Sequence, residues 1–106
     1  GTLWTRPTKT DDPAQMEYQM RMWYYFTWLS GDFLVEQACH NVDKARWVMG
    51  DAVPVAATGL GGRQVRTDPK FGNVWDNFSI VYEFPNDARV ILQCRQGANC
   101  FNKVSD

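Results

Sequence analysis

Residues 30–50 read SGDFLVEQACHNVDKARWVMG, a segment in which end signals and helical periodicity agree. Ser30 and Asp32 belong to the residue types that cap helix N-termini, and Gly50 is typical of the position after a helix. At about 100° per residue the apolar side chains fall on one arc, which predicts one long helix covering a core. That arc contains Leu34, Val35, Ala38, Val42, Ala45 and Met49.

The opposite arc of this helix carries the side chains with reactive chemistry. Glu36, His40 and Asp43 follow one another at i, i+4 and i+7, and His40 is the only histidine of the chain. An ordinary solvated helix face with weak ion pairs has the same pattern. Trp47 continues the row and favours a functional face, because a large apolar ring among polar groups indicates a surface that something covers.

Composition places the chain among soluble globular domains. It has 106 residues, 44 % of them apolar and 22 % charged, which fits a single domain. The net charge of −1, with scattered Lys and Arg, gives no argument for nucleic acid. No apolar run approaches the ~20 residues that span a bilayer, so no membrane partner is expected. Five tryptophans favour aromatic contacts at an interface or ligand site.

The cysteines indicate a reducing compartment. Cys39, Cys94 and Cys100 are odd in number and lack C-x-x-C spacing, so they predict neither a zinc site nor a disulfide framework. We expect Cys39 and Cys94 to be buried free thiols. This pattern favours the cytoplasm. Export to a bacterial periplasm is the alternative, because the chain begins with Gly1 and we expect a segment upstream of it.

The second half of the chain predicts a small antiparallel sheet. Residues 77–84 alternate between apolar and polar, residues 89–96 do the same after a turn at 86–87, and the two form a hairpin facing the helix. Residues 1–7 and 52–58 are further strand candidates, and the glycine-rich residues 59–75 read as a long loop. The expected fold is α+β: an open, mostly antiparallel sheet of three or four strands with the long helix packed on one face.

An aromatic run, MWYYFTWL at residues 22–29, precedes the main helix. Periodicity does not assign it, and we interpret it as a short helix or irregular segment packed beneath the main helix. Trp23, Tyr24 and Tyr25 either fill the core or form a wall of a ligand pocket.

Several of these motifs, in this order, resemble the C-terminal domain of the Gfo/Idh/MocA oxidoreductases. The resemblance begins with WYYFTWLSGD at residues 23–32 and VEQACHNVD at 35–43. It continues through GGRQ at 61–64, GN at 72–73 with WD at 75–76, and CRQ at 94–96. Together these motifs cover roughly residues 22–96.

The resemblance implies one half of a two-domain enzyme. Residues 1–106 would be the C-terminal substrate-binding and oligomerisation domain, or part of it, with a dihydrodipicolinate-reductase-like fold. A Rossmann domain absent from this chain would bind NAD or NADP, so cofactor-binding residues are not assigned here and the chain alone is expected to be inactive. The implied substrate is a sugar, an inositol or a derivative, and the sheet would mediate a homo-oligomer.

The resemblance also assigns roles to residues. His40 falls on the family's catalytic histidine and Asp43 on its following acid, whereas Glu36 stands where most members carry Asp. Imidazole, with a reference pKa near ~6.5, suits a general base that accepts the substrate's hydroxyl proton. Glu36 would be its partner or a substrate ligand, and Asp43 an orienting acid. The candidates for substrate contact are Trp23, Tyr24, Arg63 and Trp47.

Two other functions compete with a dehydrogenase. The first is a non-catalytic carbohydrate-binding or oligomerisation module whose helix face contacts a partner. The second is a metal hydrolase using Glu36, His40 and Asp43. One imidazole and two carboxylates on successive turns of one helix rarely make a good three-ligand site, so no metal site is predicted.

Overall fold

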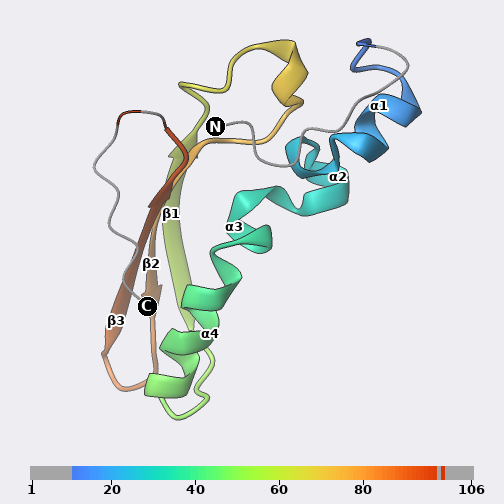
Figure 1. The fold of residues 1–106 in the computed structure, drawn as a ribbon. Helices are drawn as coiled ribbons and strands as arrows, with labels where there is room; N and C mark the ends of the chain where they lie inside the picture. Colours follow the sequence, from blue (N-terminus) through green and yellow to red (C-terminus); the bar gives the residue numbers. More distant parts are fainter. Residues whose placement is uncertain (1–10, 98, 100–106) are drawn as a thin grey trace.

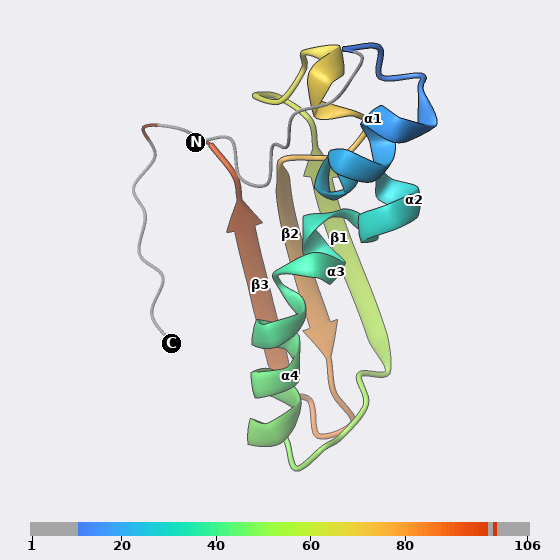
Figure 2. The same cartoon turned by 45° about the vertical axis from the view of Figure 1, so that its right-hand side comes forward.

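The computed structural model describes residues 11–97 and Asn99. Short helices lie along one face of a three-stranded antiparallel sheet, with α4 alongside the strands (Figures 1 and 2). The elements in chain order are α1 (Met16–Arg21), η1 (Trp23–Tyr25), α2 (Thr27–Ser30), α3 (Asp32–Glu36), α4 (Cys39–Val48), β1 (Ala56–Gly62), η2 (Pro69–Phe71), β2 (Asn77–Glu83) and β3 (Arg89–Arg95). This confirms the α+β class and the open antiparallel sheet. The strand expected at residues 1–7 and Cys100 lie outside the described residues.

The sheet has the order β1-β2-β3, and the β2–β3 hairpin is where the alternation predicted it. The prediction for β1 was wrong in part. The sequence predicted a strand at 52–58 and a glycine-rich loop from residue 59, but β1 continues through residues 59–62. Gly61 pairs with Phe78, and a Cβ atom at Gly61 would lie 2.7 Å from the Trp75 ring. The missing side chains therefore leave room for aromatic rings packed on the strand.

The segment predicted as one long helix is two helices, α3 and α4, separated by Gln37 and Ala38. The backbone widens at the end of α3, where the N–H groups of Gln37 and Ala38 both donate to the carbonyl of Phe33, at 3.0 and 3.1 Å. In the next turn the His40 N–H donates to the Gln37 carbonyl at 3.4 Å, an i→i−3 bond, and regular bonding resumes at Val42, whose N–H donates to the Ala38 carbonyl at 3.1 Å. A chain that departs from i→i−4 bonding for one turn shifts every later side chain around the axis.

The inner arc of these helices is confirmed for most of its predicted members. Ala38 is buried and Leu34, Val42, Ala45 and Met49 are half-buried, but Val35 is exposed. Phe33 occupies the inner position instead, with its ring 4.9 Å from that of Phe78. Burial of Cys39 was also wrong, because this thiol is exposed, whereas Cys94 is half-buried against the core.

The core is mainly aromatic and lies where η1, α2 and α3 meet the sheet. The run at residues 22–29 supplies most of it, and Tyr24 and Tyr25 meet edge to face at 5.3 Å. Such pairs contribute roughly 0.5–1.5 kcal/mol beyond burial of area. The buried cluster consists of Tyr18, Met22, Tyr24, Tyr25, Phe26, Phe33 and Val74.

One buried carboxylate organises the loop between β1 and β2. Asp76 is 2 % exposed, and its Oδ2 accepts hydrogen bonds from the N–H groups of Gln64, Val65 and Arg66 at 2.8, 2.6 and 2.9 Å. Burial alone would raise the pKa of Asp76. The hydrogen bonds from these amides and from the Asn77 side chain outweigh it, so the pKa lies below its ordinary value.

We expect Asp76→Asn to lower the free energy of unfolding by about 2–4 kcal/mol at neutral pH, because the amide replaces a charged acceptor of several hydrogen bonds. The native pKa is depressed, so the stabilisation is present above the unfolded pKa near ~4 and is lost as the pH falls through the native value. Urea denaturation of both proteins at neutral and at acidic pH measures this. A difference in stability that does not shrink in acid would contradict it.

Candidate active site

The predicted catalytic residues flank the turn between α3 and α4. Glu36 is the last residue of α3, and His40 is the second residue of α4. Glu36 is half-buried, and its Oε2 is a buried oxygen without a hydrogen-bond partner. The His40 side chain is exposed. Across residues 11–97, no hydrogen bond or ion pair joins Glu36 to His40 or Asp43, so the structure brings these groups to one turn without pairing them.

Asp43 and Trp47 continue along the exposed side of α4. Asp43 is exposed one turn beyond His40, and Trp47 keeps 70 % of its surface in contact with solvent. The helix therefore displays an imidazole, a carboxylate and an indole together. These side chains lie on the helix face for which the sequence predicted a functional role.

Tyr24 and Trp23 contribute mainly to the core. Tyr24 is 1 % exposed, and Trp23 is half-buried with its ring edge to face with that of Tyr24, at 6.0 Å. The Tyr24 hydroxyl donates to Gln37 Oε1 at 3.4 Å and accepts a hydrogen bond from Gln96 Nε2. The pKa of Tyr24 is raised, mainly because the hydroxyl is buried. Arg66 and Gln96 act to lower this pKa, and the charge of Glu36 adds to the increase. The phenol is therefore neutral at physiological pH and acts here as a hydrogen-bonding group.

Arg63 and Arg66, in the loop after β1, make different contacts. The guanidinium of Arg63 donates to the carbonyl oxygens of Arg66 and Asp68, so it anchors its own loop. Arg66, which sequence reasoning missed, is 8 % exposed, lies over the rings of Tyr24 and Tyr25 and donates to Gln96 Oε1. The sequence offered only their positions as a signal, since Arg66 follows the GGRQ motif by two residues and Gln96 ends the CRQ motif, and no spacing pairs the two.

The described residues offer no site for a metal or a dinucleotide phosphate. No three His, Cys, Asp or Glu side chains among them gather closely enough to hold a metal ion. The glycines at 59, 61 and 62 lie within β1 and lead into a loop, so they do not form a phosphate-binding turn before a helix. No helix in residues 11–97 is long and apolar enough to cross a membrane.

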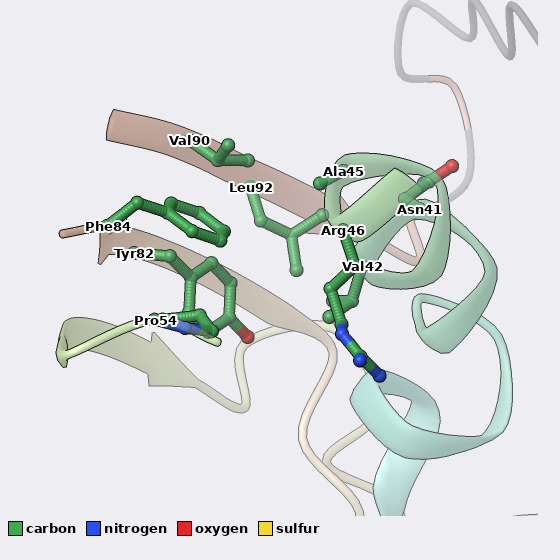
Figure 3. Close-up of a pocket in the computed structure, with 9 residues that line it drawn as sticks. All are labelled: Asn41, Val42, Ala45, Arg46, Pro54, Tyr82, Phe84, Val90 and Leu92. Carbon is green, nitrogen blue, oxygen red and sulfur yellow. The ribbon is translucent and has the colours of Figure 1, made fainter. Parts of the chain in front are cut away.

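A small gap lies between the inner side of α4 and the sheet. Figure 3 shows Val42 and Ala45 of α4 facing Leu92 and Tyr82 of the strands around it. Its volume of about 20 Å³ is room for one water molecule at most, and its walls are largely apolar. We therefore interpret it as a packing gap and place the candidate site on the other side of the helix, at Glu36 and His40.

Comparison with known proteins identifies the family. The model of the GFO/IDH/MocA C-terminal domain matches residues 4–103. The chain belongs to this family. The match confirms the resemblance seen in the motifs and extends it to nearly the whole chain.

A solved structure shares this GFO/IDH/MocA fold. It is the aldose-aldose oxidoreductase from Caulobacter crescentus complexed with glycerol, which is 28 % identical to this chain with a TM-score of 0.62. The similarity covers 84 % of this chain and 24 % of that one, so this chain spans about a quarter of its neighbour. No curated protein matches the chain.

Proposed function

We propose that this chain supplies the substrate wall and the catalytic residues of an NAD- or NADP-dependent oxidoreductase. The substrate would be the CH–OH group of a sugar, an inositol or a derivative, and the dinucleotide would be held mainly by a separate N-terminal domain. Membership of the GFO/IDH/MocA family supports this, as does a neighbour that acts between aldoses and was crystallised with a polyol.

One observation carries the proposal: the two sides of the α3–α4 turn present uncommitted reactive groups. Glu36 Oε2 is buried without a hydrogen-bond donor, and the exposed imidazole of His40 makes no hydrogen bond to any described residue. A buried acceptor without a donor costs about 1–3 kcal/mol, and native structures retain few such groups. An ion-paired helix face of the ordinary kind would have joined the two groups to each other.

These groups fit the proton-transfer half of an alcohol oxidation. A nicotinamide held by another domain would accept the hydride. His40 would take the proton from the substrate hydroxyl as general base. Glu36 Oε2 would accept a hydrogen bond from the imidazole or from a substrate hydroxyl, and Asp43, one turn away, would favour the imidazolium that forms. The substrate would lie against this face, in contact with the exposed Trp47, with Trp23 and Tyr24 in the core behind it.

The open face of the sheet supports a second part of the proposal, self-association. Leu60 of β1 is 82 % exposed on this face, and Ile91 of β3 is exposed on the same face across β2. A broad groove of about 630 Å³ crosses the same face and includes Leu60, Ser79 and Gln93. Uncovered apolar side chains on an open sheet favour contact with a second copy of the protein.

The full-length protein that contains this chain provides the test. We expect it to reduce NAD⁺ or NADP⁺ with at least one member of a panel of aldoses, inositols and sugar acids, and the 106-residue chain alone to be inactive. Carbohydrate binding without turnover on any substrate would contradict the proposal and favour the carbohydrate-binding module. Light scattering on the same preparation measures the oligomeric state. A monomer would exclude the proposed self-association.

A further inference from the structure

Arg66 is a buried cation without a counter-ion among the described residues. Its side chain forms no ion pair there, although transfer of a charge from water into a protein is costly unless it is compensated. Part of the compensation comes from aromatic faces, since the guanidinium carbon lies 5.6 Å from the centre of the Tyr24 ring and 5.4 Å from that of Tyr25. The Nη1 atom still lacks a hydrogen-bond partner. The buried guanidinium is therefore only partly compensated within the described residues.

The hydrogen bonds of Arg66 lead away from the core towards the helices. Its Nη2 donates to Gln96 Oε1, and the Nε2 of Gln96 donates in turn to Tyr24 Oη and to Gln37 Oε1. Both Arg66 and Gln96 are fixed at the backbone by Asp76, through Asp76 Oδ2 at 2.9 Å and the Asp76 carbonyl at 2.8 Å. We call the connected side chains of Arg66, Gln96, Tyr24 and Gln37 the junction clamp.

The far end of the junction clamp is the turn between α3 and α4. Gln37 is the first residue of that turn, directly after Glu36 and three positions before His40. In the backbone of this turn the His40 N–H donates to the Gln37 carbonyl at 3.4 Å, and the N–H groups of Asn41 and Val42 donate to the Ala38 carbonyl at 3.1 Å. The side chain of Gln37 links this turn directly to Gln96, the residue that follows β3. Glu36 is coupled to the same cluster, since its charge raises the pKa of Tyr24.

We propose that Arg66, Gln96 and Gln37 are positioning residues: through the junction clamp they fix the orientation of Glu36 relative to His40. This inference rests on the proposed function. Preorganised geometry matters because a displacement of about 1 Å can reduce turnover by as much as ~10²-fold. Incompletely satisfied buried polar groups, like Arg66, are few in native proteins, and functional sites are one of the places where they are retained.

The test compares two substitutions at Gln37 in the full-length enzyme. Gln37→Met keeps the length of the side chain but removes the acceptor oxygen, and Gln37→Glu keeps an acceptor for both Gln96 and Tyr24. Gln37 is exposed, so neither variant should unfold the protein. We expect kcat of Gln37→Met to fall about tenfold or more with little change in KM or Tm. Gln37→Glu should stay within about threefold of the wild type.

Two further variants complete the design. Arg21→Lys is the matched control for Arg66→Lys, because Arg21 is an exposed partner of Glu17 on α1 and lies outside the junction clamp. Arg66→Lys, which keeps the charge but loses the forked donor, should lower kcat, and combining it with Gln37→Met should add little, since the two act through one network. An active wild type whose kcat is unchanged by Gln37→Met would overturn the clamp alone. A wild type without turnover would overturn the proposed function and the clamp with it.

Discussion

Replacing His40 by Asn should reduce kcat of the full-length enzyme by about 10²–10⁴-fold, the usual contribution of a positioned general base. The Asn side chain matches part of the imidazole in shape but does not accept a proton in the physiological range. The His40 side chain is exposed and makes no hydrogen bond within the described chain, so its loss should leave the melting temperature almost unchanged.

That combination of a large kinetic effect and a small thermal effect identifies a chemical role. Steady-state kinetics with the substrate found in the panel, together with thermal unfolding, provides the measurement. Glu36→Gln is the companion variant, since it keeps the size of the side chain but removes the charge. Full turnover in His40→Asn would place the base elsewhere and return the α4 face to an ordinary solvated surface.

Gly72→Ala should lower the free energy of unfolding by more than about 3 kcal/mol, a large share of the 5–15 kcal/mol typical of native proteins. Gly72 has a φ of +57°, and a Cβ atom there would lie 2.1 Å from the carbonyl oxygen of Tyr25. This contact cannot relax easily, because the same oxygen accepts the Asn73 N–H at 3.0 Å and Asn73 Oδ1 accepts the Thr27 N–H at 2.9 Å. The clash therefore falls on the most buried part of the core.

Gly50→Ala is the matched control for this substitution. Gly50 has a similar φ of +66°, but nothing lies within 4 Å of the position that its Cβ atom would occupy. Its cost is limited to left-handed backbone strain, about 1–2 kcal/mol. Urea denaturation of both variants separates strain from clash. Equal losses at the two positions would mean that the 72–73 loop moves freely away from Tyr25.

Local patterns predicted those parts of the fold that depend on neighbouring residues. The alternation around Phe78 and Leu92 predicted the hairpin, and the apolar spacing predicted helix between Asp32 and Val48. The interruption at Gln37 was not predictable in this way, since the apolar spacing continues unbroken across it. Residues 59–62 were predicted to be loop because glycine has a low strand propensity. In the structure they pair with β2, and the Trp75 ring leaves no room for a side chain at Gly61.

The candidate site shows the same division. Glu36 and His40 were identified from spacing and from resemblance to the family. The roles of Arg66 and Gln96 depend on contacts between residues 30 positions apart, and with Tyr24, which is 72 positions from Gln96. Such contacts leave no periodic signal in one sequence. The burial of Glu36 Oε2 likewise depends on how the turn packs against its surroundings.

The triple acceptor at Asp76 has a consequence for the motions of the protein. The amides of Gln64, Val65 and Arg66 share one oxygen atom, so a fluctuation that releases the carboxylate exposes all of them to hydrogen exchange in a single event. The same event frees the backbone of Arg66, whereas Gln96 stays bound through its N–H to the main-chain carbonyl of Asp76. The backbone of residues 64–66 would then open and close as one cooperative unit, and the three amides would show the same protection against exchange.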